Sequence, residues 1–177
     1  MASRRPRAGF TAVTSAARLQ LCTVDESPED RRRHIAALLA FAPTVARSGG
    51  RMRLRFDHGP TALWLNEVLP AGDVALIGMT SDSGTIEVAN PQIVLGRYGF
   101  RDGRWTFGQG TAAAVCVARG AVQAAGTLNG HGLKIACPTV PMMLTLVAVL
   151  SRLQITAHPT EGDPRAAVSA GEVPALL

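Results

Sequence analysis

Several protein classes are excluded by what this sequence contains little of. Only 5% of its 177 residues are aromatic, and the three cysteines, Cys22, Cys116 and Cys137, form no CxxC pair. The sequence therefore predicts neither a disulfide framework nor a zinc site. No GxSxG, HExxH or P-loop motif occurs, so no metal or cofactor is expected. The 47% of hydrophobic residues exclude a disordered chain and predict a core of Ala, Val, Leu, Ile and Met.

Long hydrophobic runs are also lacking. The longest, residues 140–150, is followed by Ser151 and Arg152, and it is too short to cross a bilayer. We interpret it as a buried helix. The N-terminal residues lack the apolar stretch of an export signal. We therefore expect a soluble, cytoplasmic protein with no membrane partner.

Positive charge is concentrated at the start of the chain. The net charge is +5, but Arg4, Arg5, Arg7 and Arg18 precede every acidic residue, which leaves only +1 for the remainder. A nearly neutral body gives weak support for non-specific binding to nucleic acid. Of the 18 basic residues only Lys134 is a lysine, a bias that is typical of a GC-rich genome.

Hydrophobic periodicity predicts the elements of the first half. Ser27 and Pro28 are typical of a helix start. The helix would continue over 31–42, with Ile35, Leu38, Leu39 and Ala42 on its buried face. The strict alternation of RMRLRF, residues 51–56, predicts a strand with its arginines on one face. The other expected elements are helices at 11–21 and 61–69 and strands at 74–79, 85–89 and 92–100.

The second half repeats this order. We expect a helix at 110–126, a turn at 129–132, a strand at 133–137, a helix at 140–153, strands at 154–158 and 165–169, and a last helix starting near residue 171. The repeat indicates two αββαββ-like halves related by a pseudo-twofold axis. We divide the chain into a flexible basic tail (1–9), a first half (10–105) and a second half (106–177).

Three sets of segments carry a family resemblance. They are FTAVTSAARLQL (10–21), RRRHIAALLAFA with GGRMRLRF (31–42 and 49–56), and the stretch from VARGAVQAAGTLNG to the end of the chain (117–177). With them the sequence resembles the N-terminal half of the WhiA sporulation-regulator family, which has the LAGLIDADG homing-endonuclease fold. The resemblance implies an α+β fold in which the two halves form a saddle-shaped antiparallel sheet covered by helices.

The sequence departs from that family in two places. Members of the family carry a C-terminal helix-turn-helix domain that supplies the main DNA contacts, and this chain stops at Leu177 before any such domain. We expect either a piece of a longer regulator or a stand-alone relative. The Cys-Cys-Arg-Arg stretch of the family is replaced here by residues 29–32, Glu-Asp-Arg-Arg.

Nuclease chemistry is not expected. A nuclease of the resembled fold needs an acidic residue at the end of each of two central helices, so that paired carboxylates hold Mg²⁺ at a phosphate. The corresponding positions here are Ala42-Pro43 and Ala125-Gly126. Since alanine and glycine offer no ligand, the sequence favours a non-catalytic domain.

The leading functional interpretation is a catalytically inactive domain of a WhiA-type transcription regulator, contacting the DNA backbone or a protein of the transcription machinery. The arginines of the alternating strand would line the saddle and contact phosphates. The candidate residues are Arg51, Arg53, Arg55, Arg97, Arg101 and Lys134. The competing interpretation of the strand is a solvated face that keeps the sheet unpaired.

Two alternatives remain open. A stand-alone relative could bind a small apolar molecule, or act as an enzyme, in a pocket between the halves. The candidate residues for it are His34, Asp57, His58, Trp64, Tyr98 and Trp105. A structural homo-oligomer that buries the saddle against itself is the third possibility.

Overall fold

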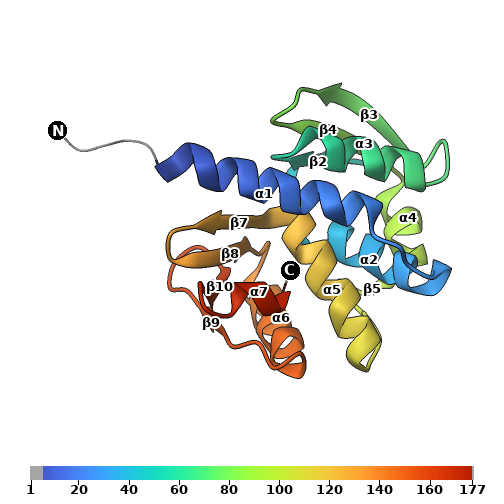
Figure 1. Ribbon diagram of the computed structural model, residues 1–177. Helices are drawn as coiled ribbons and strands as arrows, with labels where there is room; N and C mark the ends of the chain where they lie inside the picture. Colours follow the sequence, from blue (N-terminus) through green and yellow to red (C-terminus); the bar gives the residue numbers. More distant parts are fainter. Residues whose placement is uncertain (1–5, 177) are drawn as a thin grey trace.

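The computed structural model describes the backbone of residues 6–176 and the side chains of residues 10–174. Two copies of one αββαββ unit build most of it (Figure 1). The first copy comprises α2 (Pro28–Phe41), β1 (Thr44–Ser48), β2 (Arg51–Phe56), α3 (Gly59–Val68), β3 (Val74–Met79) and β4 (Gly84–Ala89). The second comprises α5 (Thr111–Ala125), β7 (Gly126–Asn129), β8 (Gly132–Ala136), α6 (Val140–Arg152), β9 (Ala157–Pro159) and β10 (Arg165–Ser169).

Each unit folds into its own four-stranded antiparallel sheet. The strand orders are β1-β2-β4-β3 and β7-β8-β10-β9, so corresponding strands occupy corresponding places. The predicted α+β fold with two αββαββ halves is thereby confirmed. Outside the repeat lie α1 (Pro6–Thr23), α4 (Pro91–Arg97), the hairpin of β5 (Phe100–Arg101) and β6 (Arg104–Trp105), and α7 (Val173–Leu176).

Three sequence-based expectations need correction. Residues 92–100 were expected as a strand, but α4 covers most of them, because Pro91 favours a helix start and only Val94 and Leu95 turn toward the core. The strands β1 and β7 were not predicted, since neither has an alternating pattern. The helix α1 begins at Pro6, so residues 6–9 are helical, whereas residues 1–5 of the expected tail lie outside the described residues.

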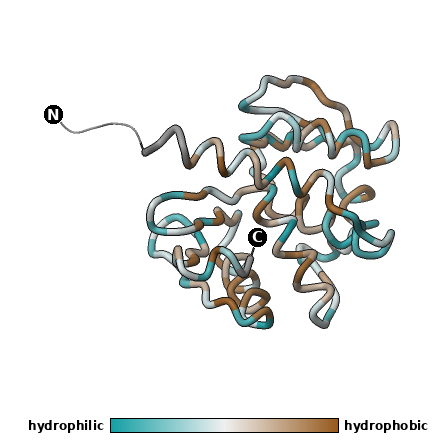
Figure 2. The backbone as a smooth tube through the Cα atoms, viewed as in Figure 1, coloured by the Kyte–Doolittle hydropathy of each residue, from teal (hydrophilic) through white to brown (hydrophobic). Residues whose placement is uncertain are grey.

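The helices α2 and α5 pack against each other at the centre of the molecule. Ser27 caps α2 as expected by accepting a hydrogen bond from the Asp30 amide. The helix changes from hydrophilic at its start to hydrophobic at its end (Figure 2). Residues 34–41 are all buried, not only one face, because α5 packs along this half of the helix and most of its side chains belong to the hydrophobic core. Gly120 permits the close approach: a Cβ there would lie 2.5 Å from the Ala37 Cβ.

Helices cover one face of each sheet. In the first unit α3 packs on β2, β3 and β4, and in the second α5 and α6 pack on β7–β10, while α1 bridges α3 and β7. The side chains of β2 alternate strictly between exposed and buried, which leaves the other face of its sheet uncovered. Within the described residues no helix is both long and apolar enough to cross a membrane.

Candidate nucleic-acid interface

The uncovered face of the first sheet, hereafter its outer face, carries a row of three arginines. Arg51, Arg53 and Arg55 occupy alternate positions of β2, and all three are exposed. The buried residues between them, Met52 and Leu54, fix the register, since a slip by one residue would move the arginines into the core. The expected placement of these three residues on one face is therefore observed.

A carboxylate already engages two of these arginines. Glu87 of β4 lies directly opposite Arg53 in the strand register. Its two carboxylate oxygens accept hydrogen bonds from Arg51 at 2.7 Å and from Arg53 at 3.1 Å. These bonds hold the pKa of Glu87 below its usual value. Arg55 has no side-chain partner among the described residues, so the row retains two excess positive charges.

The outer face of the second sheet is less densely charged. Lys134 on β8 is exposed there, as predicted, and its register partner on β10 is Ala167. Arg165, two residues before Ala167, belongs to the same face and lies 3.8 Å from the Asp163 carboxylate. Sequence analysis missed Arg165 because the strand RAAVS has small residues in place of a marked alternation.

Two of the proposed DNA contacts lie elsewhere. Arg97 is on α4, where its guanidinium pairs with Asp73 at 2.7 Å and its carbonyl accepts a hydrogen bond from Arg32. Arg101 is on β5, in the hairpin that follows α4. Neither residue belongs to the two four-stranded sheets, so they do not extend the arginine row.

The ends of the two central helices carry no metal ligands. The C-cap residues are Ala42 for α2 and Gly126 for α5, as expected from the sequence. Neither supplies a side-chain oxygen, so the divalent metal of a homing endonuclease does not fit these positions. In the described part of the chain no three His, Cys, Asp or Glu side chains gather in a way that could hold a metal ion.

A buried polar network joins α1, α2 and α5 instead. The Glu26 side chain is fully buried and contacts Arg31 at 3.2 Å, His34 at 3.0 Å and Arg119 at 3.1 Å. Burial acts to raise the pKa of the Glu26 carboxyl. Hydrogen bonds and charges from His34 and Arg119 outweigh burial and lower this pKa. Gln123 continues the network: its Oε1 lies 2.6 Å from His34 Nε2, and its amide nitrogen donates to the Cys22 sulfur. Each side chain of this network has at least one partner within it, which is typical of a structural network.

The six residues proposed for a ligand pocket do not gather in one place. The rings of His34 and Trp64 lie 5.1 Å apart in a tilted arrangement inside the protein, and the Arg31 guanidinium lies over the Trp64 ring. His58 is buried against the Thr61 hydroxyl, which lies 2.8 Å from its Nδ1. Of the remaining three, Asp57 directly precedes His58 but is exposed, Tyr98 packs under Arg32, and Trp105 lines a pocket between the halves.

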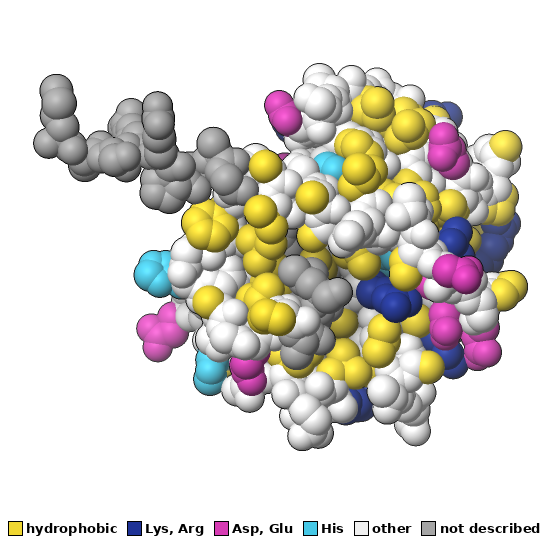
Figure 3. Space-filling model, viewed as in Figure 1, with side chains coloured by type: hydrophobic (Ala, Val, Ile, Leu, Met, Phe, Trp, Pro, Cys, Tyr) yellow, Lys and Arg dark blue, Asp and Glu magenta, His cyan; other side chains and the backbone are white. Residues whose placement is uncertain are grey.

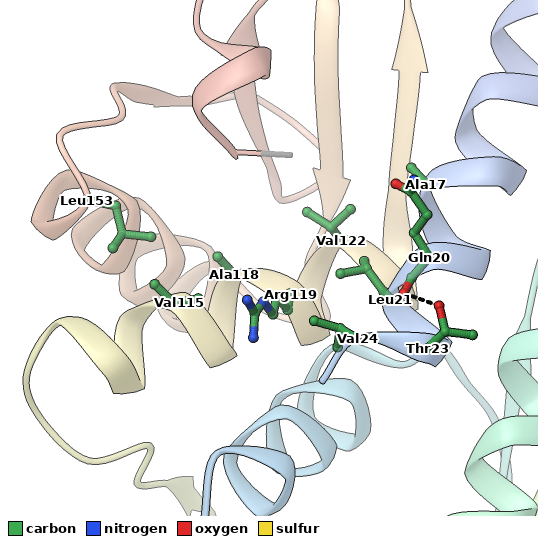
Figure 4. A pocket seen from close by; sticks show the side chains of 10 residues that line it. All are labelled: Ala17, Gln20, Leu21, Thr23, Val24, Val115, Ala118, Arg119, Val122 and Leu153. Atoms are coloured by element: carbon green, nitrogen blue, oxygen red, sulfur yellow. Dashed lines mark hydrogen bonds between the residues drawn. The ribbon is translucent and has the colours of Figure 1, made fainter. Parts of the chain in front are cut away.

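Among the cavities whose volumes suit small molecules, two are lined by residues of both halves. The first is a groove of about 540 Å³. In it, Leu21 and neighbouring side chains of α1 face Val115, Ala118 and Val122 of α5 (Figure 4). Its one charged side chain, Arg119, is held by Glu26. Hydrophobic side chains also gather over α1 on this face of the molecule (Figure 3). The second cavity, of about 730 Å³, is the pocket between the halves.

Comparison with known proteins assigns the fold. The sequence matches no protein-family model and no curated protein sequence. The structure is similar to the N-terminal LAGLIDADG domain of DUF199/WhiA, with a TM-score of 0.65 and 13% identity over 92% of this chain and 89% of that one. It is also similar to full-length DUF199/WhiA from Thermotoga maritima, with a TM-score of 0.67 and 12% identity over 92% of this chain, which spans only 60% of that protein.

A homing endonuclease is similar as well. I-DmoI, solved in complex with DNA and Mn, matches with a TM-score of 0.51 and 10% identity over 81% of this chain and 92% of that one. At such identities the likeness concerns the fold. The chain therefore has the LAGLIDADG homing-endonuclease fold, in the form found in the N-terminal domain of WhiA, and the predicted resemblance is confirmed at this level.

Proposed function

We propose that this chain is a catalytically inactive LAGLIDADG domain that binds the backbone of duplex DNA in the manner of a transcription regulator. The observation that carries the proposal is the arginine row on the outer face of the first sheet. Three guanidinium groups on alternate residues of one strand match a series of phosphates, and Arg favours bidentate contacts with such oxygens.

The ends of α2 and α5 support the catalytic inactivity that the proposal includes. A protein of this fold, I-DmoI, forms a complex with DNA and Mn. Ala42 and Gly126 stand here where paired carboxylates would be needed for metal-dependent cleavage. Binding without cleavage then depends on phosphate contacts, which provide affinity and little sequence selectivity.

The test is fluorescence anisotropy of labelled duplex DNA across a series of salt concentrations. Removal of Arg51, Arg53 and Arg55 together, each replaced by Ala, should lower the slope of log affinity against log salt by about 2 to 3. The loss arises because each phosphate contact releases counterions when it forms. Stability should change little, since all three side chains are exposed.

A matched control removes the same number of charges elsewhere. Replacing Arg97, Arg101 and Arg152 by Ala takes three exposed arginines from positions outside both outer faces. This variant should keep the slope of the unaltered protein. An equal loss in both variants would show that only net charge matters, and would remove the arginine row from the proposal.

A further inference from the structure

The helix α1 fills a groove between the two halves. It packs against β7 and α5 of the second unit and α3 of the first (Figure 1). The Thr14 hydroxyl accepts a hydrogen bond from the Leu128 amide of β7 at 3.1 Å, and the Arg18 guanidinium donates to the Gly126 carbonyl at the end of α5. The edge of β7 and the end of α5 are therefore covered.

The pseudo-twofold relation defines a second such groove. It exchanges β7 with β1, α5 with α2 and α3 with α6. The counterpart of the α1 position thus lies against β1, the end of α2 and the start of α6. No helix of the described residues occupies it, and every residue of β1 is exposed. The 730 Å³ pocket lies here, lined by Ala42, Thr44 and Met142 among others.

One wall of this pocket is aromatic. Phe100 and Trp105 of the β5–β6 hairpin line it, with their rings 5.1 Å apart. Trp105 stacks on Phe107, and Phe107 on Phe41 of α2, in parallel arrangements. Four of the eight aromatic residues in the chain are thus collected beside one cavity, although the chain as a whole is poor in aromatic side chains.

The charged side chains of the lining are exclusively basic. Arg47 of β1 and Arg104 of β6 belong to it, and neither guanidinium has a hydrogen-bond or ion-pair partner among the described residues. Arg47 points to the helix-covered side of its sheet, because it is the register partner of buried Met52. This direction separates it from the arginine row, which lies on the opposite face.

From these features we propose that the pocket between the halves binds a small amphipathic organic anion, with its apolar body against the aromatic wall and its acidic group on Arg47 and Arg104. The volume lies within the range of small-molecule sites, and an apolar lining with a few convergent polar groups is their usual composition. A carboxylate, sulfonate or phosphate group satisfies the two guanidiniums as charge-assisted hydrogen-bond acceptors. The site does not depend on DNA binding.

The test uses two fluorescent probes that differ in one charge. The anionic probe is anilinonaphthalene sulfonate, and its neutral counterpart is N-phenylnaphthylamine, which lacks the sulfonate. The full chain should bind the anionic probe about tenfold more tightly than the neutral probe, which is the usual contribution of a charge-assisted contact. The double variant Arg47→Gln, Arg104→Gln should abolish this difference and leave the affinity for the neutral probe unchanged.

A second pair of variants tests whether the probes bind in this pocket. Thr145→Phe adds a ring inside the pocket lining and should weaken both probes at least about tenfold. Leu144→Phe adds bulk at the neighbouring exposed position of α6, outside the lining, and should leave both affinities unchanged. Denaturant unfolding of all variants distinguishes loss of the pocket from loss of the fold.

Three outcomes would overturn the proposal. One is equal affinity of the unaltered chain for the two probes, and another is probe binding that survives Thr145→Phe. The third is self-association that Thr145→Phe abolishes, which would assign the pocket to a second copy of the chain. None of them alters the expected salt dependence of DNA binding, so the two proposals fail separately.

Discussion

The two halves of this protein share one topology and differ in what they place on it. The first sheet carries three arginines and a glutamate on the outer positions of β2 and β4, whereas the second carries Lys134 and Arg165 among small residues. The buried positions correspond closely: Leu54 opposite Ile86 in one sheet, Ile135 opposite Ala166 in the other. Packing therefore maintains the symmetry, and the solvent-exposed positions are free to diverge in function.

The connections before the two central helices differ in the same way. The segment before α2 is one long helix, α1, which seals the groove beside β7. The segment before α5 is a short helix and a two-stranded hairpin, which leaves a pocket beside β1. The difference shows that a pseudo-symmetric fold can hold two unlike sites at equivalent places.

The largest expected effect comes from separating the halves. In the variant Gly120→Val the added side chain would begin with a Cβ 2.6 Å from the His34 carbonyl oxygen and 2.5 Å from the Ala37 Cβ. Because the obstacles include backbone, α2 and α5 must move apart, and the free energy of unfolding should fall by more than about 3 kcal/mol. Urea unfolding measures this loss.

The matched control is Gly96→Ala in α4, where an added Cβ meets nothing within 4 Å. It should raise the free energy of unfolding by about 0.5 to 1 kcal/mol, the advantage of alanine in a helix. Comparable stability of the two variants would show that the halves are not held together at Gly120.

The next largest effect concerns the buried polar network, whose carboxylate, Glu26, belongs to the first half. Glu26→Gln leaves Arg31, His34 and Arg119 without their shared anion, and should lower the free energy of unfolding by about 2 to 3 kcal/mol. Glu29→Gln, at an exposed position with one surface ion pair, should cost less than about 1 kcal/mol.

The same variants predict a pH dependence. Since the pKa of Glu26 is lowered in the fold, its contribution is complete above the ordinary glutamate pKa of about 4.3 and is lost as the pH falls below it. Acid unfolding should therefore be less steep in Glu26→Gln than in Glu29→Gln. Identical acid transitions in the two would contradict the assignment.

A smaller effect is expected from variants that make the two outer faces more alike. Glu87→Gln frees Arg51 and Arg53, and should steepen the salt dependence of DNA affinity by about one contact. Ala167→Glu places a carboxylate opposite Lys134, as Glu87 stands opposite Arg53, and should change the salt dependence in the reverse direction. Anisotropy titrations of both variants on one duplex provide the comparison. A change of the salt dependence with the same sign in both variants would refute the prediction.

The smallest effect is expected from variants that each remove one cation, one variant for each half. Neither Arg55 nor Lys134 has a side-chain partner among the described residues, and Arg55→Gln and Lys134→Gln each remove one of these cations from an outer face. If DNA spans both sheets, each variant should lower the salt slope by just under 1. A change in Arg55→Gln alone would confine the interface to the first sheet.

Most regular elements were predictable from local pattern. The alternation of residues 51–56 correctly predicted both a strand and its exposed arginines, and Ser27-Pro28 correctly predicted a helix start. The failures occurred where partners lie far away in sequence. The residues of β1 and β7 are strands because β2 and β8 offer them free backbone groups. Residues 92–100 have β-branched side chains typical of strands, yet Pro91 and the docking of Val94 and Leu95 make them helical.

The sequence by itself determined the repeat, the apolar central helices with small contact residues and the absence of carboxylates at their ends, because these follow from periodicity and residue type. Only the tertiary structure decided which charges meet: that Glu87 lies opposite Arg53, that Arg97 pairs with Asp73 away from the sheets, and that aromatic rings of the hairpin face α6 across a pocket. These contacts join residues remote in sequence. Their geometry depends on sheet register and on how the two halves pack, which no local pattern encodes.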